Sequence, residues 1–559
     1  MTSLRHRWSG SPTRSCHSWP EALRDLKPSE IGLSLTADAE VIVVGGGHNG
    51  LLCAAYLARA GVDTLVLEAR PTVGGSASTV EDLGARFNVC HCTHSLIRAL
   101  PLDEELGLSD HGLSYLSTDA DCIFSFHDGH DPWVLFHDAE RTLEGLSAPH
   151  PGSVDGYRRY LADTLPVAEL VLDMLRTQPT APRLAAGAMR RGNRGLGRLL
   201  RWSRASAAEV LDNYFEDWRL AIPAAAIGPT VWGVTPEAPG TGLAALAYAI
   251  RHRVQSGRPA GGSGALVEAI RSSFEAAGGR VMCGARVESL PLRKGLLDGV
   301  VLSDGTHLRA RTVVAACDPS DVFVRWLGSD LPPSARRLAN RWRQVPRPKG
   351  YESKVDAVLA GIPIPAAAGT LAGHIPGFDA VGHTTVVSPS PDDLRQAHHR
   401  RADGQVAERP TLLIDVPSLV DPSMSPGVGR HVLSLEVLFT PYDHPGGWAT
   451  SSEPDRWLDL WASQMLPEAR SLIEDWRVMT PDRYEAEFSM HQGYSPAWAG
   501  SPLDAFLGRS PELTRYRTPI AGLFLTGAGT YPGAGIVGAS GRNTARVVLA
   551  ALTSRNGGG

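Results

Sequence analysis

Three glycines with a fixed spacing are the first residues in this chain that could do chemistry. Gly45, Gly47 and Gly50 follow the apolar run of residues 41–44 in a G-x-G-x-x-G pattern. One glycine makes a tight turn, one lets the backbone approach a pyrophosphate, and one lets the next helix pack on the strand. Residues 51–60 are typical of that helix, whose N-terminal amides and positive dipole end attract phosphate. The pattern predicts a dinucleotide-binding turn.

An acidic residue completes this pattern. A second strand is predicted over residues 64–67, and it leads directly to Glu68. Glu68 lies eighteen residues after Gly50, close to the usual distance for a carboxylate that binds the hydroxyl groups of a ribose. The β-α-β unit over residues 41–75 therefore predicts a phosphate site and a ribose site.

Glycines recur in two further stretches. Gly74 and Gly75 close the β-α-β unit, and residues 527–535 read Gly-Ala-Gly-Thr-Tyr-Pro-Gly-Ala-Gly after a predicted buried strand over residues 522–526. Such stretches let the backbone come close to a phosphate or a ring. We interpret the two ends of the chain as parts of one nucleotide-binding domain.

The stretch Cys90-His91-Cys92-Thr93-His94 contains side chains that bind metals. On a strand, Cys90, Cys92 and His94 would share one face. A closed zinc site needs four ligands and the sequence offers no second cluster, so we predict no metal. A cavity-lining stretch and a catalytic or cofactor-linking histidine are the two remaining interpretations.

The composition argues against several classes of protein. The chain has 559 residues, 43% hydrophobic and 20% charged, which is typical of a globular protein with two or three domains. A net charge of −5 gives no indication of nucleic-acid binding. Seven scattered cysteines, without a Cys-x-x-Cys or Cys-x4-Cys pair, argue against a disulfide framework and a dithiol reductase.

The sequence also bears on where the protein resides. The uncharged runs over residues 41–58 and 519–541 contain too many glycines to span a membrane. Residues 1–38 lack a continuous apolar stretch, so we expect a disordered leader, with a transit peptide as the alternative. The abundance of Ala, Gly and Arg indicates a GC-rich bacterial genome. We expect a cytoplasmic protein.

Together these motifs resemble the flavin-dependent oxidoreductases related to bacterial phytoene desaturases, within the amine-oxidase-like flavoprotein superfamily. The resemblance covers residues 39–553, and the stretches that carry it are residues 43–51, 67–70, 73–75, 261–266, 417–423 and 528–535. It implies an α/β fold: a Rossmann-like FAD-binding domain assembled from three segments, with an inserted α+β substrate domain. The expected segments are 39–115, 256–329 and 511–559 for the FAD-binding domain, and 116–255 and 330–510 for the substrate and lid domain.

The resemblance implies that FAD binds to both glycine-rich ends of the chain. Glu68 would hold the adenosine ribose, and Val287 would touch adenine through its backbone. The full set of implied cofactor contacts is Gly45, Gly47, His48, Asn49, Gly50, Glu68, Arg70, Gly74, Gly75, Ser76, Val287, Gly527, Ala528, Gly535, Ile536 and Val537.

The resemblance also implies an activity. We expect hydride transfer to the flavin from an organic, largely apolar substrate that is thereby dehydrogenated, or desaturated. Only one strand-embedded G-x-G-x-x-G exists, so no NAD(P)H site is evident and dioxygen or a quinone is the expected electron acceptor. The alternatives are an amine oxidase-like enzyme that oxidises a C–N bond and, from another class, a non-catalytic binder of a prenylated or lipid-like ligand.

Three residues are candidates for catalysis. His94 lies just after a strand that enters the flavin cavity in the family, and His491 lies where relatives carry a histidine near the substrate. A base with a near-neutral pKa suits C–H oxidation. Tyr531, where carotene desaturases tend to have the histidine of a His-Pro pair, could donate to a substrate heteroatom. Structural histidines and a tyrosine packed on the flavin are the alternatives.

A basic segment remains unexplained by these motifs. Residues 174–208 contain eight arginines and no acidic residue. Arg190, Arg194, Arg198 and Arg201 would fall on one stripe of a continuous helix, which would be compatible with peripheral membrane contact through residues 183–204. Glycines weaken a helix there, so a solvated lid or a flexible loop is the alternative.

Overall fold

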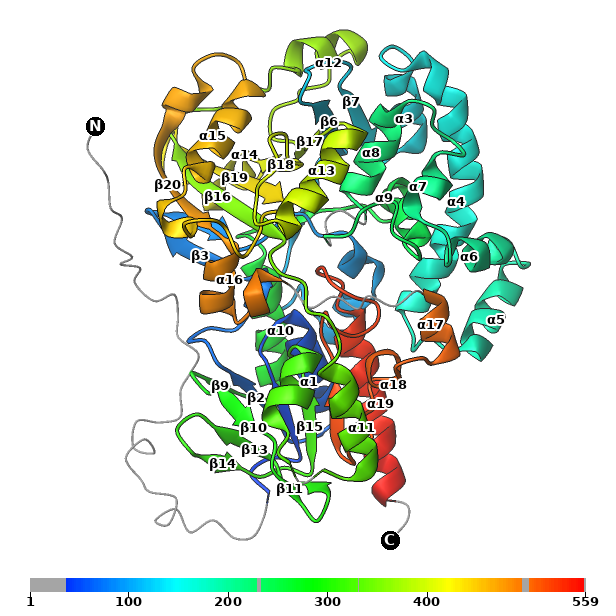
Figure 1. The fold of residues 1–559 in the computed structure, drawn as a ribbon, viewed down its shortest axis with the longest axis vertical. Coiled ribbons are helices and arrows are strands. Elements are labelled where there is room, and N and C mark those ends of the chain that lie inside the picture. The colour runs from blue at the N-terminus through cyan, green and yellow to red at the C-terminus, as the bar shows by residue number, and fades with distance from the viewer. Residues whose placement is uncertain (1–36, 229–232, 330, 495–501, 557–559) are drawn as a thin grey trace.

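The structure of the protein, a computed structural model, describes residues 37–228, 233–329, 331–494 and 502–556. Two large sheets organise these residues. A parallel sheet and its helices occupy the lower half of Figure 1, and a mixed sheet with further helices occupies the upper half. The fold is α/β, and the segments that build each half are far apart in the sequence.

The parallel sheet has five strands in the order β21-β15-β1-β2-β9. Every neighbouring pair is parallel, and β1 lies at the centre with Val41 opposite both Thr312 and Thr64. All four residues of β1 are buried, as expected for a strand covered on both faces. The strand bounds are β1 Val41–Val44, β2 Thr64–Glu68, β9 Arg280–Cys283, β15 Thr312–Ala315 and β21 Leu523–Leu525.

Three helices pack on this sheet around one apolar core. Helix α1 contacts both α10 and α19, and buried leucines, valines and alanines of all three helices belong to that core. Helix α19 begins next to the second glycine run, so the chain's last helix closes the domain that its first strand opens. The helix bounds are α1 His48–Arg59, α10 Gly264–Ala276 and α19 Ala539–Asn556.

The mixed sheet has seven strands in the order β20-β16-β19-β18-β17-β6-β7. All neighbouring pairs are antiparallel except β17 and β6. The sequence pattern predicts a strand over residues 431–438, and β19 has those bounds. The strands are β6 Ala120–Phe126, β7 Trp133–Phe136, β16 Glu352–Leu359, β17 Thr385–Ser388, β18 Leu412–Asp415, β19 His431–Leu438 and β20 Ile473–Met479.

Helices surround the mixed sheet. An aromatic cluster that includes Trp133, Tyr157, Tyr160 and Tyr248 joins β7 to the helices on the right of Figure 1. Those helices are α3 Ala139–Leu146, α4 Val154–Leu175, α5 Ala181–Arg190, α6 Leu196–Trp202, α7 Ala207–Leu211, α8 Trp218–Ala226 and α9 Ala247–Arg253. The other longer helices are α11 Pro333–Trp342, α12 Ala368–His374, α13 Pro391–Ala402, α15 Glu453–Ser463, α16 Pro481–Phe488 and α17 Pro502–Leu507.

Several smaller sheets complete the fold. Two-stranded ribbons are formed by β3 with β4, by β5 with β8 and by β11 with β12, while β10, β13 and β14 form a three-stranded sheet. Their bounds are β3 Thr79–Asp82, β4 Ala85–Asn88, β5 Tyr115–Leu116, β8 Arg258–Pro259, β10 Val287–Ser289, β11 Leu292–Arg293, β12 Leu296–Leu297, β13 Val300–Leu302 and β14 His307–Leu308.

One expectation about local structure was wrong, and two other stretches differ from a regular element. The sequence pattern predicts one helix over residues 454–475, but α15 ends at Ser463 and residues 473–479 form β20, because Pro467 cannot continue the helix. The stretch from Cys90 to His94 is not a strand; only His94 makes an isolated bridge, to Gly257. The basic segment is not one helix, because the chain turns between α5 and α6.

The uncharged runs lie in the folded domain. Residues 41–58 form β1, the first glycine turn and most of α1. Within the described part of the chain, no helix combines the length and apolar character needed to cross a membrane.

Helix α19 offers a test of how closely the domain is packed. A Cβ at Gly541 would lie 2.2 Å from the carbonyl oxygen of Asn49 in α1. We expect Gly541→Ala to lower the free energy of unfolding by about 1–3 kcal/mol, because one of two helices must shift. Gly197→Ala in α6 is the matched control, since its Cβ meets no atom within 4 Å. Denaturant unfolding of both variants checks the difference, and equal stability would contradict this packing.

Candidate functional site

The first glycine turn brings three elements into direct contact. Gly45 has a φ of +107°, and a Cβ there would lie 2.9 Å from the carbonyl oxygen of Ala316, just after β15. A Cβ at Gly50 would lie 2.0 Å from the carbonyl oxygen of Gly45. Any side chain at these two positions would separate β1 from α1 or from β15. The turn therefore requires glycine for packing at its first and last positions.

Gly47 differs from these two glycines. It caps α1 with an ordinary extended backbone (φ −70°, ψ 168°), and no side chain hydrogen-bonds to the cap. No protein atom lies within 4 Å of the position that a Cβ would take. The first turn of α1 contains no acidic residue, so its amides and positive dipole end face open space. This geometry fits the pyrophosphate of FAD.

Glu68 holds the turn in shape at the end of β2. Its Oε2 accepts a hydrogen bond of 2.8 Å from the amide of Gly46, and its Oε1 accepts one of 2.9 Å from the amide of Arg70. The side chain of Arg70 donates to Ser78 at 3.1 Å and lies over the ring of Phe488. The predicted ribose ligand therefore lies next to the predicted phosphate site.

The second glycine run is folded onto the start of α19. The hydroxyl of Ser540 accepts a hydrogen bond from the amide of Gly527 at 3.0 Å and pairs with the hydroxyls of Thr526 and Thr530. The amide of Gly541 donates to the side chain of Asn49 at 3.2 Å. The two glycine-rich motifs thus meet although they stand at opposite ends of the sequence.

A cavity of about 330 Å³ lies where the two halves of the protein meet. The predicted cofactor contacts that line it are His48, Ser76, Ala528, Gly535, Ile536 and Val537. Its apolar wall, from the region of α8 and α9, consists of Ile227, Leu243, Ala244, Ala247 and Ile250. The remaining predicted contacts lie outside this lining: around the two glycine turns and, for Val287, at the start of β10.

His94 lines the cavity, but its ring is engaged by the protein. One ring nitrogen is 3.1 Å from the hydroxyl of Tyr115 and the other is 3.1 Å from that of Ser263. Burial, with smaller contributions from nearby positive charges, lowers the pKa of His94 to about 3. The imidazole is therefore neutral near pH 7, and its role as a catalytic group stays a prediction.

The other two candidate catalytic residues do not line the cavity. His491 lies 3.6 Å from a carboxylate oxygen of Glu485, and the cavity is lined instead by its neighbour Met490. Tyr531 is buried, and its carbonyl oxygen accepts a hydrogen bond of 3.0 Å from Tyr516. Burial raises the pKa of the Tyr531 hydroxyl. The structure does not bring these two residues together with His94.

The sequence alone did not identify several charged residues of the cavity wall. Glu352 of β16, Glu436 of β19 and the ion pair between Asp121 and Arg251 all line it. The alternation Glu352-Ser353-Lys354-Val355-Asp356 was a visible signal, because charges at every second position of a strand share one face. No cluster of three or more metal-binding side chains occurs among the residues that the structure describes.

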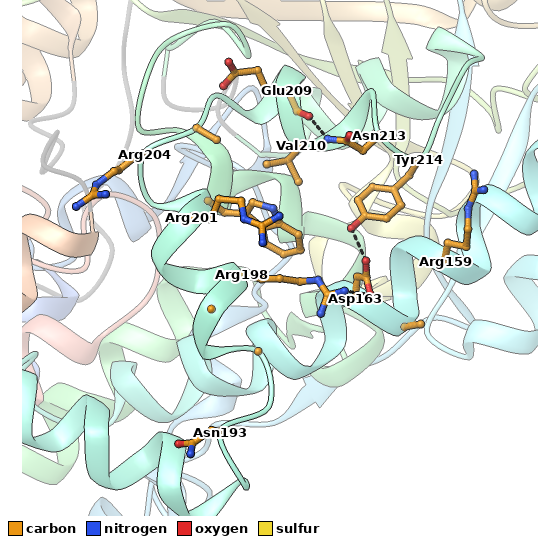
Figure 2. A pocket seen from close by; sticks show the side chains of 15 residues that line it. Arg159, Asp163, Asn193, Arg198, Arg201, Arg204, Glu209, Val210, Asn213 and Tyr214 are labelled. Atoms are coloured by element: carbon orange, nitrogen blue, oxygen red, sulfur yellow. Dashed lines mark hydrogen bonds and ion pairs between the residues drawn. The ribbon is translucent and has the colours of Figure 1, made fainter.

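The basic segment borders a different cavity. A surface basin of about 1240 Å³ lies between α4, α6 and α7, with Arg159, Arg198, Arg201 and Arg204 around it (Figure 2). Arg198 pairs with Asp163 at 2.6 Å, and Tyr214 donates to the same carboxylate at 2.9 Å. Gly192 and Gly195, both with positive φ, turn the chain between α5 and α6. This basin shares no residue with the cavity between the two halves.

The empty space at Gly47 generates a test of cofactor binding. We expect Gly47→Val to fold normally, because its backbone is extended and no protein atom is close. The added methyl groups would occupy the space in front of α1, so affinity for FAD should fall at least about tenfold, or about 1.4 kcal/mol. Flavin absorbance per protein, together with circular dichroism of the apoprotein, measures both effects. Full flavin content in the variant would contradict the assignment.

Comparisons with known proteins agree with this geometry. Pyridine nucleotide-disulfide oxidoreductase domain-containing protein 2 of Rattus norvegicus is 28% identical, covering 96% of this chain and 98% of its own. The phytoene desaturase (lycopene-forming) of Pseudescherichia vulneris is 26% identical, covering 91% and 99%. The solved structure of wild-type putrescine oxidase bound to putrescine has a TM-score of 0.58 at 15% identity, covering 92% and 99%. It shares the fold.

A protein-family model matches the chain and identifies its family. The model described as flavin containing amine oxidoreductase matches residues 50–346, more than half of the chain. The match begins inside the first glycine turn and includes the strands β2, β9 and β15. The two glycine-rich motifs that meet at α1, the cavity between the two halves and this match lead to one conclusion. The chain belongs to the flavin-containing amine oxidoreductase family, and its cofactor is FAD.

Proposed function

We propose that this oxidoreductase dehydrogenates an organic substrate that has a largely apolar body. The observation that carries the proposal is that one cavity is bordered on one side by flavin-contact residues and on the other by the apolar wall. FAD, when bound, supplies the hydride acceptor. The cavity walls position the substrate and exclude water from it.

Different residues of this chain position the substrate and shape the cavity wall. Ile536 and Val537, at the flavin end, and Ile250, on the apolar wall, give the substrate surfaces to pack against. His94 is held by Tyr115 and Ser263, so it shapes the wall without carrying charge near pH 7. Such a site needs orientation more than a strong nucleophile.

An amine oxidase-like reaction at a C–N bond is the second candidate. The acidic residues Glu352 and Glu436 in the cavity wall favour it, because their side-chain oxygens can accept hydrogen bonds from an amine. A non-catalytic binder of a prenylated or lipid-like ligand is less well supported. The space in front of Gly47 and the position of Glu68 suit a bound FAD that such a binder would not need.

Dioxygen or a quinone is the electron acceptor that we propose. Anaerobic stopped-flow mixing with fractions of an extract from the protein's own organism should bleach the flavin band, and mass spectrometry should find a product that is two hydrogens lighter. Mixing the reduced protein with dioxygen or a short-chain quinone should restore the band. Equally fast reduction of the flavin by NADPH would contradict this choice of acceptor.

We also propose that the region of α5 and α6 contacts an anionic membrane surface. Met189 and Leu200 are exposed there, with exposed fractions of 66% and 39%, and Leu507 of the neighbouring α17 is exposed as well. The arginines around the basin of Figure 2 include Arg198 and Arg201 of α6, the helix that carries Leu200, and they supply positive charge to this region. Apolar and basic groups together suit the interface of a bilayer.

Vesicle flotation tests this contact. The double variant Arg201→Glu and Arg204→Glu should bind vesicles of anionic phospholipid at least about tenfold more weakly than the wild type, because each arginine contributes about 1 kcal/mol. Arg293→Glu, on the β11–β12 hairpin, is the matched control. Equal flotation of all three proteins would refute the proposal and leave a solvated surface as the explanation.

A further inference from the structure

The basin of Figure 2 is bordered by more positive charge than the protein itself neutralises. Four arginines and two acidic residues line it, namely Arg159, Arg198, Arg201, Arg204, Asp163 and Glu209. An arginine keeps its charge at every physiological pH. Four arginines against two carboxylates leave a surplus of two positive charges. The partners of the two acidic residues decide which arginines carry this surplus.

Both acidic residues of the basin are already engaged. Asp163 of α4 pairs with Arg198 at 2.6 Å, and its second carboxylate oxygen accepts a hydrogen bond of 2.9 Å from the hydroxyl of Tyr214. Glu209 belongs to the capping box of α7, where its Oε2 accepts a hydrogen bond of 2.7 Å from the amide of Ser206. Asp163 therefore balances Arg198, and Glu209 is directed to the backbone of its own helix.

The other three arginines remain without a carboxylate partner. Arg159, Arg201 and Arg204 are exposed, and none of them forms an ion pair with a residue that the structure describes. Arg201 stands three residues after Arg198 in α6, a helix that contains no acidic residue. Like charges at this spacing on a helix repel each other. A bound anion would relieve the repulsion and supply the missing partner.

The surplus charge surrounds a hollow. The basin has a volume of about 1240 Å³, which leaves room for a phosphate group together with the organic part of an ester. In Figure 2, Arg198 and Arg201 lie near its middle, while Arg159 and Arg204 lie on opposite sides. Gly197 of α6 also lines it, and a Cβ at Gly197 would meet no protein atom within 4 Å. A ligand can therefore approach the backbone of α6 closely.

We propose that the basin binds a phosphate monoester through these arginines. A phosphate monoester carries roughly two negative charges near pH 7, which matches the surplus. Guanidinium groups donate pairs of parallel hydrogen bonds to phosphate oxygens. The side-chain amide of Asn193, which lines the basin as well, adds a further donor. A carboxylate or a sulfate ester brings a single charge and would leave one positive charge unbalanced.

Two sources can supply such a group. Leu200 of α6 is exposed and stands three residues after Gly197, so it lies on the face of the helix that borders the basin. The acyl chain of a membrane lipid such as phosphatidic acid can pack there. A soluble phosphate ester fills the same basin without a membrane. The site therefore does not require the membrane contact proposed for α5 and α6.

Titration calorimetry on the FAD-loaded full-length protein tests the site, because FAD then occupies the other phosphate-binding position. The probes are sn-glycerol 3-phosphate and glycerophosphocholine, a phosphate diester without net charge. We expect the monoester to bind at least about tenfold more tightly than the diester. Equal affinity for the two probes, or no binding of either at about 10 mM, would overturn the proposal.

Arginine variants show whether the basin itself is responsible. Arg201→Gln and Arg159→Gln should each weaken the binding of glycerol 3-phosphate at least about fivefold. Arg194→Gln is the matched control, because Arg194 is an exposed arginine between α5 and α6 that does not line the basin. Its affinity should stay within about twofold of the wild type. Equal losses in all three variants would indicate diffuse attraction to a basic surface and contradict a site.

A change at Gly197 tests the hollow without altering any charge. The ring of Gly197→Phe would fill the space beside α6, so the affinity for glycerol 3-phosphate should fall at least about fivefold. Gly197→Ala adds only a methyl group and should bind within about twofold of the wild type. Circular dichroism checks that both variants are folded. Full affinity in a folded Gly197→Phe variant would contradict the basin as the binding site.

Vesicle flotation distinguishes the two sources. Phosphatidic acid and phosphatidylglycerol are each mixed with phosphatidylcholine to the same surface charge. A preference for phosphatidic acid that glycerol 3-phosphate abolishes supports the site with a lipid ligand, and equal flotation on both vesicles with calorimetric binding supports it with a soluble one. A preference that glycerol 3-phosphate leaves unchanged would contradict the site. Absence of flotation would refute the proposed membrane contact and leave a calorimetrically measured phosphate site standing.

Discussion

The close packing of α1 is the constraint on which the rest of the structure depends. No side chain separates it from β1 at Gly50 or from α19 at Gly541, where added Cβ atoms would reach backbone oxygens at 2.0 Å and 2.2 Å. Its N-terminus is thereby held at the carboxyl edge of the parallel sheet, with Gly47 facing open space. That edge is where ligands bind in open α/β sheets. The hydrogen bond from Gly541 to Asn49 brings the last segment of the chain to the same edge.

The position of the mixed sheet is set by its contacts with the other half of the protein. Its buried charges are compensated partly across the boundary between the two halves, as when Lys354 donates to the carbonyl oxygen of Asn88 and Arg477 lies 3.6 Å from Asp82. Such contacts hold the mixed sheet against the β3–β4 ribbon that follows the first glycine turn. Removing one partner of a buried ion pair lowers the stability of the protein. These pairs therefore also fix the position of the mixed sheet. The cavity is the space left between the N-terminus of α1 and the buried charged face of the mixed sheet.

The sequence predicted the fold class and the cofactor because those depend on backbone geometry that only certain residues allow. Gly45, Gly50 and Glu68 act within one β-α-β unit, so their spacing carries the information. Glu352 and Glu436 act together only after β16 and β19 pair, and no local pattern shows that pairing. The helix expected over residues 454–475 failed for a related reason, because Pro467 and the pairing of β20 with β16 overrode a helical pattern that was locally plausible. The glycines expected to weaken a helix in the basic segment do turn the chain between α5 and α6.

Burial favours the uncharged form of titratable groups on both sides of the cavity. It lowers the pKa of His48 to about 4 and that of His94 to about 3, so the wall nearest the flavin-contact residues is uncharged near pH 7. It raises the pKa of Glu352, where the neighbouring Glu436 acts in the same direction. Near pH 7 the two histidines and Glu352 are therefore all mostly uncharged. A hydride transfer site gains from this arrangement, because a fixed charge beside the flavin ring would favour one redox state over the other.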